Sequence, residues 1–196
     1  MMKNKFDRSY WELRYEENKT GWNIGYASLP IKEYIEQLED KSATILIPGA
    51  GNSYEAQLLW NNGFINTFVL DIAKQPLENL KNRVETFPNN QLLHQDFFEL
   101  NKTFDLIIEQ TFFCALNTDL RNQYAEKMYQ LLKPNGKLVG LFFDFPLTES
   151  GPPFGGSIEE YKSIFGKYFK IKTLERATNS IKERQGKELF FIFERL

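Results

Sequence analysis

The chain has 196 residues, of which 42% are hydrophobic and 26% are charged, and its formal net charge is −2. This length fits one domain, and without a basic excess the chain is not expected to bind nucleic acid or an anionic membrane surface. A single cysteine, Cys114, excludes an internal disulfide, and no segment resembles a secretion signal or a run of about 18 apolar residues. We therefore expect a soluble cytoplasmic protein, and nothing predicts an obligate protein partner.

Hydrophobic periodicity and turn residues predict alternating helices and strands. In chain order these are helix 6–18, helix 30–39, strand 43–47, helix 53–62, strand 67–71, helix 74–86, strand 91–94, strand 104–109, helix 119–132, a turn at 133–136, strand 137–143, helix 158–166, strand 169–177 and strand 187–194. This alternation predicts an α/β domain with helices on both faces of a parallel sheet. The last two strands suggest an antiparallel hairpin. We expect one domain, residues 1–196, with a seven-stranded, mostly parallel sheet.

A glycine-bearing turn links the first predicted strand to its helix, because residues 48–51 are Pro-Gly-Ala-Gly. Glycine lets the backbone turn sharply and approach a ligand closely. The first turn of the following helix offers free N–H groups. Asn52 and Glu55 resemble a capping box at the start of that helix. Gly49 and Gly51 therefore predict a ligand-binding edge.

Asp71 ends the next predicted strand, at the distance from Gly51 where doubly wound folds place the acid that binds ribose hydroxyls. Its alternative role is to cap the helix that follows. The third glycine of a dinucleotide fingerprint is replaced here by Tyr54. Glu55 in the first helical turn disfavours a pyrophosphate. This pattern favours S-adenosylmethionine (SAM), which has no phosphate and is cationic at sulfur, over NAD.

Asp96 and Phe97 follow the third predicted strand. In a sheet of this kind the loop at that point reaches the adenine, where a carboxylate can accept a hydrogen bond from the exocyclic amine and an apolar ring can pack on the base. The alternative role of Asp96 is that of a turn residue.

Nine segments carry a family resemblance. They are Trp11, 20–22 (Thr-Gly-Trp), 46–51 (Leu-Ile-Pro-Gly-Ala-Gly), 70–72 (Leu-Asp-Ile), 96–98 (Asp-Phe-Phe) with 104–107 (Phe-Asp-Leu-Ile), 112–116 (Phe-Phe-Cys-Ala-Leu), 131–136 (Leu-Leu-Lys-Pro-Asn-Gly) and 151–154 (Gly-Pro-Pro-Phe). Through them nearly the whole chain resembles the thiopurine S-methyltransferase superfamily, and most closely its thiol and halide methyltransferases. Proline 48 stands where the commoner residue is acidic, and Ala50 where many relatives have cysteine.

The resemblance implies a Rossmann-like class I methyltransferase fold, SAM as cofactor and S-adenosylhomocysteine as product. The cofactor-binding residues that we expect are Trp11, Trp22, Gly49, Gly51, Asp71, Ile72, Asp96, Phe97, Glu109 and Gln110. The expected acceptor pocket contains Trp22, Phe112, Phe113, Phe145 and Pro146, with help from the loop at 151–153. Residues 1–40 are expected to form a helical lid over the cofactor.

Methyl transfer from a sulfonium is an in-line displacement that chiefly needs alignment. An apolar pocket suits a soft anion such as a thiolate, thiocyanate, bisulfide or halide, because desolvation raises its reactivity. Should a base be needed, Glu109 is the candidate by position; its alternative role is to hold the loop after the fourth strand. Cys114 is not expected to act as a nucleophile, and no metal-ligand spacing occurs. A methyltransferase for another oxygen, nitrogen, selenium or tellurium acceptor, a SAM-binding protein without catalysis, and an NAD oxidoreductase remain as alternatives.

Overall fold

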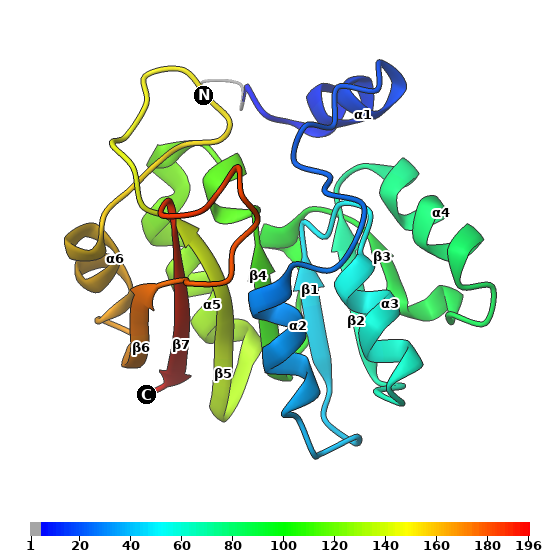
Figure 1. Cartoon of the computed structure of the whole chain (residues 1–196). Helices are drawn as coiled ribbons and strands as arrows, with labels where there is room; N and C mark the ends of the chain where they lie inside the picture. The colour runs from blue at the N-terminus through cyan, green and yellow to red at the C-terminus, as the bar shows by residue number, and fades with distance from the viewer. Residues whose placement is uncertain (1–4) are drawn as a thin grey trace.

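The computed structural model describes residues 5–196 as alternating helices and strands (Figure 1). In chain order these are α1 (Arg8–Glu16), α2 (Leu29–Glu36), β1 (Ile45–Pro48), α3 (Tyr54–Asn61), β2 (Thr67–Asp71), α4 (Lys74–Arg83), η1 (Asn89–Gln91), β3 (Leu92–His94), η2 (Phe97–Glu99), β4 (Phe104–Gln110), η3 (Phe113–Ala115), η4 (Thr118–Leu120), α5 (Arg121–Leu131), β5 (Leu132–Phe143), α6 (Ile158–Phe165), β6 (Phe169–Arg176) and β7 (Glu188–Arg195). Residues 1–4 of the predicted lid lie outside the described residues.

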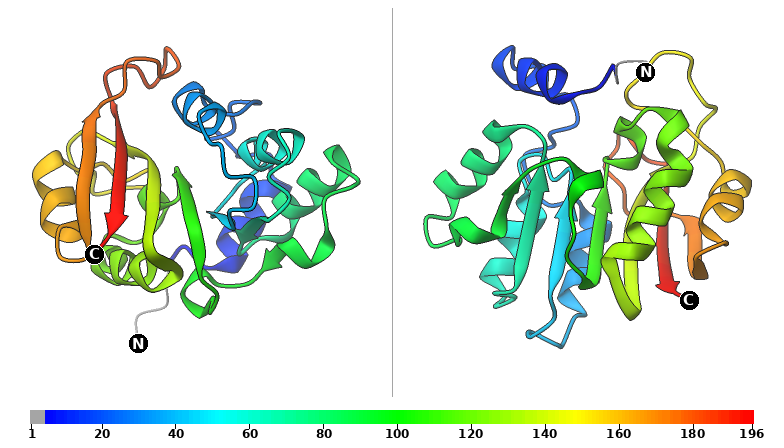
Figure 2. Two further views of the ribbon diagram at one scale, coloured as in Figure 1. Left: turned by 90° about the horizontal axis from the view of Figure 1, so that it is seen from below. Right: turned by 180° about the vertical axis from the view of Figure 1, so that it is seen from behind.

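The seven strands form one sheet in the order β3-β2-β1-β4-β5-β7-β6. The first five strands along the chain pair in parallel, whereas β7 pairs antiparallel with both β5 and β6. Helices cover both faces of this sheet (Figure 2). The prediction of a mostly parallel seven-stranded sheet with a terminal antiparallel hairpin is confirmed.

Each face of the sheet has its own hydrophobic core, because successive strand side chains point to opposite faces. In β1, Ile45 and Ile47 belong to the core shared with α2, α3 and α4, whereas Leu46 belongs to the core shared with α5 and α6. All three side chains are at most 3% exposed. Continuous apolar runs are typical of parallel strands buried on both faces, which explains why the sequence predicted them so clearly.

Phenylalanine rings hold the antiparallel half of the sheet to its helices. Phe142 of β5 stacks on Phe191 of β7 with ring centroids 4.0 Å apart, and Phe165 of α6 lies 5.2 Å from both Phe142 and Phe193. Aromatic pairs at such separations stabilise the fold beyond their buried area. Much of the high phenylalanine content therefore serves the core.

Two local predictions at helix ends are wrong. The N-cap of α3 is Ser53 in the left-handed region (φ +56°), and it makes no side-chain capping bond. Glu55 accepts a hydrogen bond from the Ser28 N–H (2.9 Å) instead of completing a capping box, and Asn52 accepts one from Asn79. After α5, the chain enters β5 directly at Leu132, so the predicted turn at 133–136 lies within the strand.

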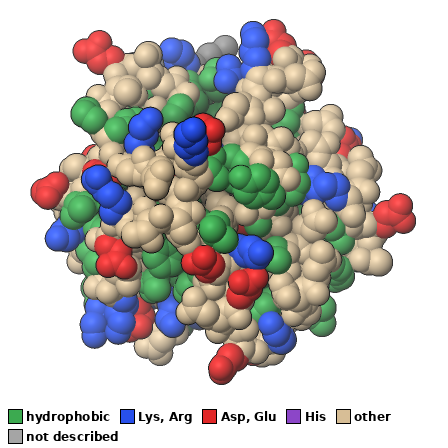
Figure 3. All heavy atoms as spheres, in the orientation of Figure 1, with side chains coloured by type: hydrophobic (Ala, Val, Ile, Leu, Met, Phe, Trp, Pro, Cys, Tyr) green, Lys and Arg blue, Asp and Glu red, His purple; other side chains and the backbone are tan. Residues whose placement is uncertain are grey.

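On the face shown in Figure 3, blue Lys and Arg side chains alternate with red Asp and Glu side chains and form no continuous basic patch. No helix within residues 5–196 has the length and apolar character needed to cross a membrane.

Candidate active site

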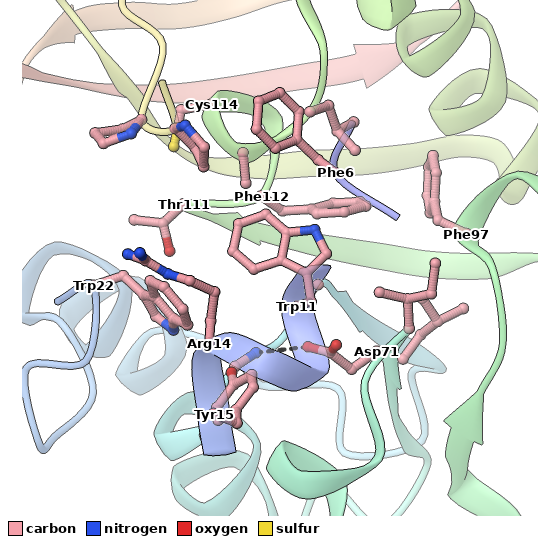
Figure 4. A pocket seen from close by; sticks show the side chains of 18 of the residues that line it. Phe6, Trp11, Arg14, Tyr15, Trp22, Asp71, Phe97, Thr111, Phe112 and Cys114 are labelled. Atoms are coloured by element: carbon pink, nitrogen blue, oxygen red, sulfur yellow. Dashed lines mark hydrogen bonds between the residues drawn. The ribbon is translucent and has the colours of Figure 1, made fainter. Parts of the chain in front are cut away.

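A cavity of about 390 Å³ lies where the carboxyl ends of β1 and β2 and the loops after β3 and β4 meet α1 (Figure 4). Eight of the ten predicted cofactor-binding residues line it: Trp11, Trp22, Gly49, Gly51, Asp71, Ile72, Asp96 and Phe97. They come from four separate parts of the chain, and the parallel strand order brings them together at one edge of the sheet. Ligands in open α/β sheets bind at this edge.

The two glycines of the turn after β1 both adopt a left-handed backbone, with φ +54° at Gly49 and +52° at Gly51. A Cβ atom on Gly49 would lie 2.1 Å from Cδ2 of Phe112. Any other residue at this position would force the Phe112 ring or the turn to shift, because such a separation is far below van der Waals contact. The Gly51 N–H donates a hydrogen bond to Oδ2 of Asp71 (3.2 Å; dashed line in Figure 4), which joins the turn to the end of β2.

Asp71 is buried, 7% exposed, at the floor of the cavity. Besides the bond from Gly51, its Oδ1 accepts a hydrogen bond from the Ala73 N–H (2.9 Å). Burial raises the pKa of this carboxyl to about 6, and the backbone hydrogen bonds only partly oppose the rise. The Ile72 N–H is a third backbone donor to this carboxyl, and since a carboxylate has about four acceptor sites, at least one stays available to a ribose hydroxyl.

Asp96 and Phe97, which follow β3, also line the cavity. Asp96 accepts a hydrogen bond from the Phe98 N–H (2.8 Å) and caps the short helix η2. It therefore also has the alternative role, that of a turn residue. The Phe97 ring is almost fully buried and lies 5.2 Å from the ring of Phe112.

An aromatic wall from the N-terminal segment covers the glycine turn. The Trp22 ring makes edge contacts with Trp11 (5.5 Å) and Tyr15 (5.7 Å), and its indole N–H donates a hydrogen bond to the Tyr15 hydroxyl. A Cβ atom on Gly51 would be 3.5 Å from Nε1 of Trp22 and 3.6 Å from the Tyr15 hydroxyl. The aromatic wall of Trp11, Tyr15 and Trp22 therefore packs close to the glycine turn.

Glu109 does not line the cavity, although it was the predicted candidate base. It is fully buried, and its Oε1 accepts hydrogen bonds from the N–H groups of Phe112 (2.9 Å) and Phe113 (3.1 Å), while Oε2 accepts one from the Tyr124 hydroxyl. Burial raises its pKa to about 7. The geometry matches the alternative role, since these bonds hold the loop after β4, in which Thr111 has a left-handed backbone (φ +57°).

Four other predicted residues also lie outside the cavity lining. Gln110 accepts a hydrogen bond from the Ser28 hydroxyl (2.9 Å). Phe113 is 1% exposed within the core of α5 and α6. Phe145 bridges to Gly156, and its neighbour Pro146 is exposed. Of the predicted acceptor pocket, only Trp22, Phe112 and the prolines of the 151–153 loop reach the cavity.

The cavity also contains residues that the sequence did not indicate: Phe6, Arg14, Tyr15, Thr111, Phe143 and Arg184. Arg184 belongs to the loop between β6 and β7, where its Nη2 donates to the Trp22 carbonyl (3.0 Å) and its Nη1 to Glu188 (3.4 Å). These bonds join the two ends of the chain over one site. Cys114 lines the cavity too, but burial raises the pKa of its thiol, which keeps it unreactive. Within residues 5–196 no group of three or more potential metal ligands occurs.

The sequence model of the thiopurine S-methyltransferase family matches residues 6–196. The chain belongs to this family. It is similar to probable thiol methyltransferase 2 of Arabidopsis thaliana, with 33% identity over 79% of this chain and 70% of the relative. It is also similar to thiocyanate methyltransferase 1 of Brassica oleracea, with 29% identity over 91% of this chain and 81% of the relative.

Solved structures of methyltransferases share the fold. The 1,6-didemethyltoxoflavin N1-methyltransferase of Burkholderia thailandensis, bound to its substrate and S-adenosylhomocysteine, superposes with a TM-score of 0.78 at 16% identity, over 96% of this chain and 86% of that chain. The magnesium protoporphyrin IX methyltransferase of Synechocystis PCC 6803, bound to SAM, gives 0.73 at 13% identity, over 96% and 95%. The family member described here is thus a SAM-dependent methyltransferase with the class I, Rossmann-like fold.

The residues at the cavity fit SAM. The missing Cβ at Gly49 leaves room for the Phe112 ring, which lines the cavity, and Asp71 keeps an acceptor site for a ribose hydroxyl. No phosphate-binding arrangement is present at α3, because Glu55 occupies its first turn. This donor and acceptor set matches a phosphate-free nucleoside better than a dinucleotide.

Proposed function

We propose that this enzyme transfers the methyl group of SAM to a small, soft, anionic nucleophile, namely a thiolate, thiocyanate, bisulfide or halide. One observation carries the proposal: the guanidinium of Arg184 lies beside an aromatic and proline-lined part of the cavity, 5.8 Å from the Phe143 ring centroid. Two of its five N–H groups are engaged by Trp22 and Glu188. No hydrogen bond within residues 5–196 engages the others, and we propose that they bind the anion.

The size of the cavity supports a small acceptor. About 390 Å³ is near the lower end for small-molecule sites, and most of it would be taken by the adenosine and methionine portions of the cofactor. The names of the thiol and thiocyanate methyltransferases to which the chain is similar agree with an acceptor of this kind.

The chain's residues would align and desolvate the reactants. When bound, SAM supplies an electrophilic methyl group on sulfur and leaves as S-adenosylhomocysteine. Phe112, Phe143 and Pro152 would exclude water from the acceptor, and Arg184 would hold it in place by charge. An anionic nucleophile has no proton to lose, so the reaction needs no base, which agrees with the remote position of Glu109.

For the cofactor we propose that Asp71 binds the ribose, Asp96 and Phe97 the adenine, and Trp11 and Trp22 the methionine half. A lid that closes over the cofactor, formed by residues 1–40, stays a prediction. Cytoplasmic localisation also stays a prediction.

The acceptor class is tested by measuring S-adenosylhomocysteine formation with bisulfide, thiocyanate, iodide, an aromatic thiol and a thiopurine. We expect turnover with at least one of them and a KM for that anion about tenfold higher in Arg184→Met. The matched control is Lys182→Met, an exposed cation of the same loop, which should leave KM unchanged. Turnover only with neutral amines or alcohols, or equal effects of the two variants, would contradict the proposal.

Cofactor affinity should depend on pH through Asp71. Its ionised form accepts the ribose hydroxyls, and its pKa is about 6. Acidification through pH 6 protonates the carboxyl and removes an acceptor, so we expect S-adenosylhomocysteine to bind about tenfold more weakly at pH 5 than at pH 7.5. Titration calorimetry measures this. In Asp71→Asn, binding should be weak at both pH values; equal affinity of the wild type at both would refute the assignment.

A further inference from the structure

Arg14 of α1 reaches the cavity with its charge unpaired. The residue lines the cavity, and its Nε atom is buried without a hydrogen-bond partner. Within residues 5–196, no hydrogen bond or ion pair engages its side chain, and its guanidinium carbon lies 5.8 Å from the Trp22 ring centroid. A buried donor left without a partner costs free energy and calls for an explanation.

The acidic residues of the cavity do not supply the missing partner. Asp71 is bonded to the N–H groups of Gly51 and Ala73, and no cation contributes to its pKa shift. Asp96 is bonded to the Phe98 N–H. The other arginine of the cavity, Arg184, has an acidic partner in Glu188. Arg14 therefore brings the one positive charge of the lining that lacks an acidic partner among the described residues.

The position of Arg14 indicates which ligand group it meets. In Figure 4 its side chain rises from α1 into the cavity, between Trp22 and Trp11 in this view, on the side away from Phe97. Trp22 itself adjoins the Gly51 backbone. Arg14 thus stands on the Trp22 side of the cavity, away from Phe97. SAM and S-adenosylhomocysteine carry one anionic group, the carboxylate of the amino-acid portion.

We propose that Arg14 binds the carboxylate of the cofactor's amino-acid portion. The planar guanidinium matches a carboxylate with two parallel N–H···O bonds, and the buried Nε would gain its missing acceptor. Because Arg14 belongs to α1, the cofactor would itself fasten this helix over the cavity. The inference rests on the cofactor, and it holds whatever the methyl acceptor is.

The test compares two ligands by titration calorimetry: S-adenosylhomocysteine, which has the carboxylate, and 5′-deoxy-5′-methylthioadenosine, which lacks the amino-acid portion. In Arg14→Met, we expect the Kd of S-adenosylhomocysteine to rise about 10- to 100-fold and that of methylthioadenosine to stay within about twofold. Arg14→Lys keeps the charge without the planar fork and should give an intermediate loss.

The matched control is Arg8→Met, which removes an exposed arginine from the same helix and should change neither Kd. Unchanged S-adenosylhomocysteine binding in Arg14→Met would overturn the proposal, even if the KM of the acceptor rose, since Arg14 would then serve the acceptor. Equal losses for both ligands would also overturn it, because Arg14 would then act only on the shape of the site. Both measurements are of ligand binding and need no methyl transfer. A failure of the proposed acceptor class would therefore not affect the result for Arg14.

Discussion

Replacing Glu109 by leucine is expected to lower the free energy of unfolding by about 3–5 kcal/mol. Three donors, the part-buried Phe112 N–H, the buried Phe113 N–H and the buried Tyr124 hydroxyl, lose their acceptor. Glu109→Gln should fold and keep kcat within about threefold of the wild type. Its amide oxygen can accept the N–H groups of Phe112 and Phe113, and its amide nitrogen can donate to Tyr124. Urea unfolding and steady-state kinetics measure both effects.

These variants distinguish a structural role of Glu109, in which it holds the loop after β4, from a catalytic role. Loss of a general base costs about 10²- to 10⁴-fold in rate, so such a loss in Glu109→Gln with unchanged stability would contradict the holding role. A second variant probes the loop directly. Thr111 keeps a left-handed backbone that glycine adopts at little cost, and Thr111→Gly should therefore recover part of the stability lost in Glu109→Leu.

Glu109 should also make stability depend on pH. Burial raises its pKa from 4.5 to about 7, so the folded state binds a proton that the unfolded state has released. The favourable contribution is complete below pH 4.5 and is lost as the pH rises through 7, about 3 kcal/mol in all. Asp71, raised from 3.8 to about 6, acts in the same direction. Unfolding curves from pH 4.5 to 8 should show a smaller decline in Glu109→Gln.

Gly49→Ala is expected to weaken S-adenosylhomocysteine binding at least about 100-fold. The new Cβ would overlap the Phe112 ring, which must move into the cavity or displace the turn. The strained φ of +54° adds a cost of about 1–2 kcal/mol. Calorimetry and thermal unfolding would measure the two effects separately.

Gly63→Ala is the matched control for this strain. Gly63 also has a left-handed backbone (φ +84°), but a Cβ there meets nothing within 4 Å. It follows α3 and lies outside the cavity lining. Its variant should lose stability without losing ligand affinity. If Gly63→Ala and Gly49→Ala had the same effect on binding, the contact with Phe112 would not matter for the site.

The sheet and its helices were predictable because each signal lies within a short stretch of sequence. Buried parallel strands such as 45–48 are continuous apolar runs, and turn glycines mark their ends. The predicted start of α3 failed because Glu55 bonds to Ser28, a residue 27 positions away. The entry into β5 failed because the turn residues at 133–136 are accommodated inside a strand, with Asn135 at φ +63°.

The place of Gly49, Gly51 and Asp71 in one cavity was predictable for the same reason, since they sit at strand ends that topology brings together. The place of the predicted acceptor-pocket residues was not. Whether Phe112 or Phe113 faces the cavity depends on the left-handed backbone at Thr111. This conformation could not be predicted from the sequence, because β-branched residues rarely adopt it. Arg184 reaches the site only through the terminal hairpin, 162 residues from its partner Trp22.

The aromatic wall gives this enzyme its own optical reporter. Of three tryptophans in the sequence, Trp11 and Trp22 line the cavity, whereas Trp60 lies on α3 against Phe87 and donates a hydrogen bond to Thr86. A ligand that enters the cavity changes the surroundings of two indoles and leaves the third alone. Intrinsic fluorescence of a Trp60→Phe protein should therefore follow cofactor occupancy without any label. In a second protein, in which Trp11 and Trp22 are replaced by phenylalanine, the emission of Trp60 should follow the integrity of the fold.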